Sequence, residues 1–281
     1  MSILPSFPAR IMKSISKIIT GLALAGLLGG CSGHKPATTA ASTSTIAIAI
    51  KRQVQAERKM YDIPPPKQLG QWTVEDILQA YGANVTGKLN YYFTKAKVSY
   101  PPREVTFIAL KQEKKLELWA RDSGEFRFIR DYYILASSGV AGPKLRQGDK
   151  QVPEGIYRIE GLNPNSHYHL SMKINYPNEF DFSHAAQEGR ADQGSDIFIH
   201  GKAASIGCLA MGDEAIEELF VLTAQVGAEN VKVVIAPHDP RAYPLKADSE
   251  ELPEWTPELY SIISREIEAL SPVVKSAKTG L

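Results

Sequence analysis

The stretch DIFIHGKAASIGC, residues 196–208, carries the strongest structural and chemical signal in the chain. It begins as a short apolar strand that ends at His200, and Gly201 allows the chain to turn there. Cys208 follows a second glycine, Gly207, a few residues later. A thiol nucleophile needs a nearby base, and an imidazole can accept its proton. The segment therefore predicts a strand, a turn and a cysteine–histidine pair.

The cysteine count bears directly on that prediction. The chain has two cysteines, and the other one, Cys31, stands at the end of an apolar leader. Cys208 is then expected to be an unpaired thiol, which is a liability in an oxidising compartment unless it is buried or used. A free cysteine is most often a small buried hydrophobic residue, and a strand-end histidine is most often only hydrogen-bonded. The joint occurrence of Cys208 and His200 beside two glycines favours the nucleophile and base instead.

The residues around Cys208 suggest supporting roles. The backbone N–H groups of Gly207 and Cys208 are candidates to bind a developing oxyanion, and such donors typically contribute about 3 kcal/mol each. Ser205 is expected to brace the loop through its hydroxyl. Gly201 is expected to let the chain turn directly after His200.

Residues 1–30 have the composition of a targeting segment, with three cations, no acid and an apolar run over 18–30 that is short for a membrane span. The run ends in LGGCS, residues 28–32, which resembles a bacterial lipobox. That resemblance implies cleavage before Cys31 and a lipid anchor on it, so that the protein is held on a membrane surface and faces the periplasm. Ser32 favours the outer membrane over the inner one. An ordinary signal peptide with a chance cysteine is the alternative.

Charge and composition exclude several classes of function. Removal of the three cations in residues 1–30 from the total of 32 Lys and Arg leaves 29 against 31 Asp and Glu, a net charge of −2. This balance gives no support to nucleic-acid binding, which is marked by a basic patch. One thiol and scattered histidines give no ligand spacing for a metal, and no G-x-S-x-G motif is present for a serine hydrolase. We expect neither a metal nor another cofactor.

Composition divides the chain into five expected parts. They are a lipoprotein-type signal peptide over 1–30, a flexible tether over 31–71, a short helical region over 72–103, a catalytic domain over 104–245 and a peripheral segment over 246–281.

Hydrophobic patterning predicts a mainly β domain with flanking helices, of the α+β class. Expected strands cover 105–110, 116–121, 126–136, 155–159, 168–174, 196–200 and 231–236. Expected helices run from the cap Thr73 to Gly82, over 85–96, from the cap Asp213 to Gly227, and over 255–271 at the periphery.

Alternation in the strand over 168–174 places Tyr168 and three aliphatic residues on its apolar face. His167 and His169 fall on the polar face. They line the cleft or lie on the open surface, and the surface is the expected place.

Two segments together resemble the YkuD-type L,D-transpeptidase domain, over about Glu104 to Ala236. The first is GDKQVPEGIY, residues 148–157, and the second is HG at 200–201 followed by SIGC at 205–208, similar to the family's H-G and S-H-G-C. The resemblance implies a YkuD-like β-sandwich, with Cys208 as nucleophile and His200 as base. It also implies peptidoglycan stem peptides with meso-diaminopimelate as substrate, attacked to form a thioester.

Two positions depart from the family pattern. Ile206 stands where the family has its second histidine, and Ala210 stands where an Arg or Asn is usual. The pattern is most similar to the YafK-like branch, which includes an amidase that releases a lipoprotein from peptidoglycan. A peptidoglycan-linked lipoprotein is therefore a candidate partner, and hydrolysis is favoured over transfer.

Two other functions stay open on the residues. One is a true L,D-transpeptidase that forms 3–3 cross-links, and the other is a non-catalytic lipoprotein that binds the wall. A redox thiol protein is disfavoured because Cys208 has no partner cysteine.

Overall fold

The computed structural model describes residues 70–270. The signal peptide, the lipid attachment at Cys31 and nearly all of the expected tether lie outside the described residues. The elements below belong to one compact unit, Pro66–Leu281. Within residues 70–270, no helix is both long and apolar enough to cross a membrane.

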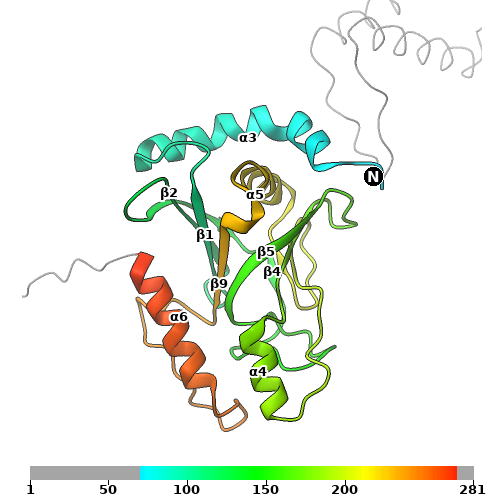
Figure 1. Ribbon diagram of the computed structural model, residues 1–281, viewed down its shortest axis with the longest axis vertical. Coiled ribbons are helices and arrows are strands. Elements are labelled where there is room, and N and C mark those ends of the chain that lie inside the picture. The colour runs from blue at the N-terminus through cyan, green and yellow to red at the C-terminus, as the bar shows by residue number, and fades with distance from the viewer. Residues whose placement is uncertain (1–69, 271–281) are drawn as a thin grey trace, which may run out of the picture. The chain divides into compact units, whose positions relative to one another are not determined.

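A single nine-stranded mixed sheet forms the body of this unit, in the order β3-β2-β1-β9-β5-β6-β7-β8-β4 (Figure 1). The strands are β1 (Glu104–Leu110), β2 (Lys115–Arg121), β3 (Arg127–Tyr133), β4 (Ala136–Ser137), β5 (Gly155–Asn163), β6 (Ser171–Ile174), β7 (Phe198–His200), β8 (Leu209–Ala210) and β9 (Val231–Ala236). The helices are α3 (Val74–Ala96), α4 (Glu179–Gln187), α5 (Asp213–Val226), α6 (Thr256–Leu270) and a short 3-10 turn, η1 (Ala228–Asn230).

Strand β5 joins the two halves of the sheet. Its first residues pair with β9, and the residues from Ile159 onward pair with β6, with a register shift between Ile159 and Gly161. Such a bulge bends and twists a strand, which lets one strand serve two differently oriented halves. The predicted class, mainly β with flanking helices, is confirmed. In place of two separate sheets, the two halves belong to one curled sheet and have β5 in common.

Helices cover both faces of the half of the sheet that contains β1 and β9. Val105, Phe107 and Ala109 of β1 belong to the core under α3 and α5, whereas Ile108 and Leu110 belong to a second core under α6. Because both faces are buried, β1 reads as an apolar run without polar alternation. Figure 1 shows α3 above α5, with α6 packed at the other side of the sheet beside β9.

The C-terminal helix corrects one expectation. The helix expected at the periphery over 255–271 is α6, and its Tyr260, Ile263 and Ile267 are buried against β1 and β9. Without it, an apolar sheet face would stand open to water. The segment therefore completes the core.

The N-terminal helices also differ from the prediction. Thr73 caps α3 as expected, in a capping box with Asp76, but Gly82 does not end the helix. The buried stripe of Ile77, Val85 and Leu89 continues past the glycine. Packing of this stripe outweighs the penalty of about 1 kcal/mol for a glycine inside a helix.

The other two differences concern the N-cap of α5 and the presence of α4. Helix α5 ends at Gly227 as expected, but Gly212 rather than Asp213 is its N-cap. Helix α4 was outside the prediction because its apolar pattern is weak. Its N-terminal signal is the capping box between Asn178 and Asp181.

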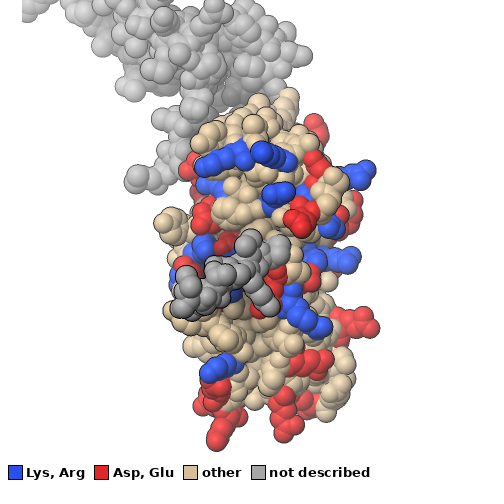
Figure 2. Space-filling view, turned by 90° about the vertical axis from the view of Figure 1, so that its left-hand side faces the viewer, with Lys and Arg blue, Asp and Glu red and all other residues tan. Residues whose placement is uncertain are grey.

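The surface shown in Figure 2 carries cationic and anionic side chains close to one another rather than a continuous patch of one sign.

Candidate active site

The adjacent parallel strands β7 and β8 bring Cys208 and His200 together. Ile199 pairs with Leu209 and His200 pairs with Ala210, so Cys208 falls opposite Phe198. Residues two positions apart lie on the same face of a sheet. The register therefore directs the thiol and the imidazole to one side, where both line the same cleft.

That cleft has a volume of about 520 Å³. Its walls come from the loop after β4, the turn between β5 and β6, strand β7 and the loop before β8. A larger groove of about 740 Å³ lies among α3, β3 and the start of α5, and neither Cys208 nor His200 lines it. The reactive residues therefore mark the smaller cleft as the candidate active site.

The thiol of Cys208 is partly exposed and belongs to a free cysteine. Burial raises the pKa of this thiol, while a backbone hydrogen bond from Phe198 and the charge of Lys144 partly offset that rise. At neutral pH the thiol is therefore protonated in the resting protein, and attack requires a base to remove the proton.

His200 is oriented as such a base. Its Nδ1 lies 2.6 Å from the carbonyl oxygen of Gly201. A carbonyl only accepts, so Nδ1 carries the proton and Nε2 keeps its lone pair. Burial lowers the pKa of His200 below its usual range, which keeps the ring neutral at pH 7. The sequence could not identify this orienting carbonyl.

Tyr168 packs on the imidazole. The ring centroids of Tyr168 and His200 are 4.6 Å apart. Alternation placed Tyr168 on a buried strand face, which is wrong, because β6 begins only at Ser171 and Tyr168 is 41% exposed. Tyr168 instead lines the cleft and holds the ring from one side.

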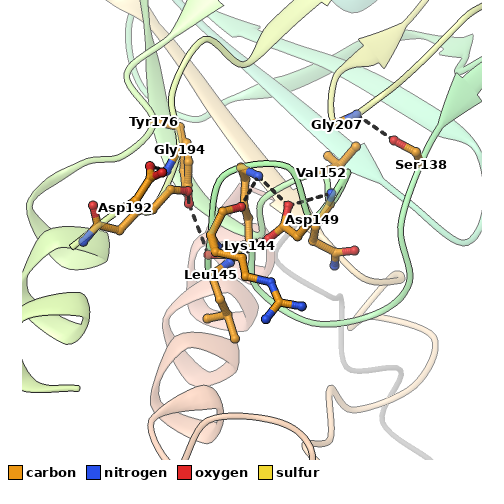
Figure 3. Close-up of polar contacts among 12 residues, drawn as sticks. Ser138, Lys144, Leu145, Asp149, Val152, Tyr176, Asp192, Gly194 and Gly207 are labelled. Atoms are coloured by element: carbon orange, nitrogen blue, oxygen red, sulfur yellow. Dashed lines mark hydrogen bonds and ion pairs between the residues drawn. The ribbon is translucent and has the colours of Figure 1, made fainter. Parts of the chain in front are cut away.

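A pair of serines fixes the loop that presents Cys208. The Ser205 hydroxyl donates to the Cys208 carbonyl at 2.7 Å and accepts from the Ser138 N–H at 3.2 Å. The Ser138 hydroxyl in turn accepts the N–H of Gly207 at 2.6 Å (Figure 3). Ser205 thus lies where the sequence suggested, while Ser138 carried no sequence signal.

The contact with Ser138 corrects the oxyanion prediction. Because the Gly207 N–H is bound to Ser138, it does not point at a reacting carbonyl in this structure. The N–H of Cys208 is the donor left from that prediction. Gly207 itself has φ of +117°, a conformation that favours glycine.

Gly201 is required for a different reason. A Cβ atom at this position would lie 2.6 Å from the carbonyl oxygen of Tyr168 and 2.8 Å from a carboxylate oxygen of Asp213. The same carboxylate accepts the N–H of Lys202 at 2.8 Å. The turn after His200 therefore packs closely against the Tyr168 carbonyl and the Asp213 carboxylate, and a side chain larger than that of glycine does not fit there.

The two neighbouring histidines have separate positions. His167 is exposed, as expected, and it also borders the cleft. His169 pairs with Glu217 of α5 at 2.8 Å, and this hydrogen bond raises its pKa. Residues 70–270 contain no group of three or more His, Cys, Asp or Glu that could hold a metal ion.

The structure also shows where the two positions that depart from the family pattern lie. Ile206 is 74% exposed and lines the cleft, whereas Ala210 is fully buried. The cations of the cleft come instead from Lys144 and Lys150 of the loop after β4. Sequence reasoning used residues 148–157 only as a family motif, which includes Lys150 but not Lys144, and gave neither side chain a role.

Comparison with known proteins finds one family match and one set of curated relatives. Residues 104–235 match the model of the YkuD family, described as the L,D-transpeptidase catalytic domain. YafK of Escherichia coli (strain K12), which carries a provisional L,D-transpeptidase name, is 37% identical over 132 residues. The match covers 45% of this chain and 51% of that protein, so the chain spans about half the length of the curated relative.

Solved structures show weaker likeness. Pgp2, a helical cell shape determining protein of Campylobacter jejuni, is 20% identical with a TM-score of 0.40, and the match covers 53% of this chain and 55% of that chain. Bd1075 of Bdellovibrio bacteriovorus is 20% identical with a TM-score of 0.36, over 59% of this chain and 56% of that chain. The resemblance expected for Glu104 to Ala236 is therefore confirmed by the sequence matches: residues 104–235 match the YkuD family model, described as the L,D-transpeptidase catalytic domain.

Proposed function

We propose that this protein is a cysteine enzyme of peptidoglycan in which Cys208 attacks an amide of a stem peptide that contains meso-diaminopimelate. The observation that carries the proposal is a neutral imidazole, oriented by the Gly201 carbonyl, that shares a cleft with a free thiol. The YkuD family assignment of the surrounding domain supports peptidoglycan as the substrate class.

The residues suggest a two-stage reaction. In the first stage, Nε2 of His200 takes the thiol proton as sulfur bonds to the substrate carbonyl carbon. The imidazolium then gives that proton to the leaving nitrogen, the C–N bond breaks, and a thioester remains on Cys208. In the second stage, water loses a proton to His200 and attacks the thioester. The C–S bond breaks, the sulfur takes that proton back from His200, and the products are a free carboxylic acid and the restored thiol.

Hydrolysis is the proposed outcome because two positions near the nucleophile lack the polar groups that are usual in the family. The exposed apolar side chain of Ile206 occupies the position of a family histidine, and Ala210 is buried and uncharged. A bond between peptidoglycan and an attached lipoprotein is the proposed target, in line with the similarity to the YafK-like branch. The proposed location is the periplasmic side of the outer membrane, through a lipid on Cys31.

Digestion of purified sacculi tests this function. The full chain in detergent and its Cys208→Ala variant are each incubated with sacculi that carry bound lipoprotein, and the products are identified by mass spectrometry. We expect lipoprotein release and a new carboxylate on the stem peptide with the unmodified protein only. New 3–3 cross-links would instead establish transfer. Identical profiles from both proteins, with both bound to sacculi, would overturn the enzyme and leave a wall-binding lipoprotein.

A further inference from the structure

We propose that Lys144, held in place by Asp149, is a positioning residue whose ammonium stabilises the Cys208 thiolate as the thiol loses its proton. This role would replace the cation that Ala210 does not supply. The inference rests on the proposed function, because it concerns the nucleophile of the same reaction.

Lys144 is an unusual lysine because its side chain is only 4% exposed although it lines the cleft. Its Nζ contacts Asp149 Oδ1 at 2.5 Å and donates to the Arg146 carbonyl at 2.9 Å (Figure 3). An ammonium has three N–H donors, and these two contacts account for two of them. Burial of a long cationic side chain is costly unless its charge is used or paired.

The loop that carries Lys144 is held firmly. The Asp149 carboxylate also accepts the backbone N–H groups of Leu145, Arg146 and Gln151 at 3.0–3.1 Å. The hydroxyl of Tyr176 lies 3.2 Å from the Lys144 carbonyl oxygen and 2.9 Å from that of Gln193, so it is shared between the two. The position of the ammonium is therefore fixed by the fold rather than chosen by a flexible surface side chain.

The same loop packs directly behind the nucleophile. A Cβ atom on Gly207 would lie 3.5 Å from the Gln151 carbonyl oxygen and 3.9 Å from the carbonyl carbon of Lys150. Gly207 is also bound to Ser138, at the start of the same loop. The residue before Cys208 is thus enclosed by the loop that holds Lys144 and Asp149.

Several charged or titratable groups share the cleft with the sulfur. They are Lys144, Lys150, His167, Tyr168, Asp196 and His200. Lys144 acts to lower the pKa of Cys208, and Asp196 acts to raise it. The Asp196 carboxylate is paired with Lys173 at 3.1 Å, and His200 is neutral at pH 7. Lys150 is exposed, so water screens its charge more than that of the buried Lys144.

Asp149 makes the proposal testable in two directions. The carboxylate fixes Lys144 but also cancels part of its field at the sulfur. Removal of the lysine charge should therefore make the thiol harder to ionise, whereas neutralisation of Asp149 should make it easier. A purely structural role of the loop would not give opposite effects.

The experiment measures the rate of Cys208 alkylation by iodoacetamide in the full chain from pH 6 to 11, resolved by peptide mass spectrometry. For Lys144→Met we expect a rate roughly three- to tenfold lower at neutral pH and an unchanged limiting rate at high pH. Lys144→Arg should restore the original profile, and Asp149→Asn should shift its midpoint to lower pH. Lys150→Met is the matched control and should shift the midpoint much less. Thermal unfolding of each variant confirms that it is folded.

Three results would overturn the proposal. They are an unchanged midpoint in Lys144→Met, the same rate loss at every pH in both Lys144 variants, and an equal shift in Lys150→Met. Alkylation needs no peptidoglycan, so these outcomes are independent of the sacculus digestion. Failure of the digestion with a shifted midpoint would refute the enzyme activity and leave the role of Lys144 at the thiol intact.

Discussion

The half of the sheet that contains β1 and the half that contains β7 are stabilised by different interactions. Strand β1 pairs with seven residues of β2 and six of β9, and helices bury both of its faces. Strand β7 pairs with only two residues of β8, yet these two strands present the imidazole and the thiol. The long ladders define the fold by apolar burial. The short ones depend on side-chain hydrogen bonds from Ser138, Ser205 and Asp149 to hold their loops.

The first test of this difference is Cys208→Ser, in the half of the sheet that carries the site. It should have the largest effect on activity. A hydroxyl is far less acidic than a thiol, so we expect activity on sacculi to fall at least about a thousandfold. The melting temperature should change little, because the substitution keeps the shape of a partly exposed side chain. Turnover near that of the unmodified protein would show that the nucleophile is another residue.

Phe107→Ala in β1 should show the reverse pattern. Phe107 is fully buried between the sheet and the helices above it, so the change should cost about 3–5 kcal/mol in the free energy of unfolding. Urea unfolding measures this loss, and the folded fraction should keep its activity per molecule. Tyr133→Ala is the control in β3 at the edge of the same sheet, where the side chain is 82% exposed and the cost should stay within about 0.5 kcal/mol. Equal costs would contradict the assignment of the core.

The pH dependence of activity tests the resting state of the cleft. Burial lowers the pKa of His200 and raises that of Cys208, so the active form has a neutral imidazole and a neutral thiol. Activity should therefore fall about tenfold per pH unit only below the lowered His200 value, which lies under its usual 6.5 or so. It should persist through pH 8. Rapid alkylation of Cys208 at pH 5 would indicate a preformed thiolate–imidazolium pair instead.

Ser205→Ala should have the smallest effect. It removes the hydroxyl that links the Cys208 carbonyl to the Ser138 N–H, and such a hydrogen bond is worth about 1 kcal/mol. We expect kcat/KM to fall roughly three- to tenfold and the melting temperature to fall by only about 2–4 °C. A large loss of stability with unchanged kcat/KM would place Ser205 with the fold rather than with the site.

The parts of the molecule that depend on patterns among neighbouring residues could be predicted from the sequence. Apolar runs located the β1–β2 hairpin and β9, Gly227 marked the end of α5, and the segment from His200 to Cys208 identified the cleft. These features arise from neighbouring residues, so a single stretch contains them.

Other features depend on contacts between distant segments. Gly82 lies inside α3 because buried neighbours hold the helix together. The Gly207 N–H is occupied by Ser138, which is 69 residues away in the chain. The Lys144 carbonyl contacts the hydroxyl of Tyr176, which is 32 residues away, and α6 covers a sheet face that apolar pattern alone did not assign to it. No local pattern in the chain marks these partners.

The most direct test of the account is detection of an acyl group on Cys208 during turnover. The full chain is mixed with stem-peptide substrate at pH 7, quenched in acid, digested and analysed by mass spectrometry. We predict that the peptide with Cys208 gains the mass of the acylating stem peptide. The corresponding peptide from Cys208→Ser should remain unmodified, and that variant should release no product. Product release with an unmodified Cys208, and at the same rate in Cys208→Ser, would contradict the central claim.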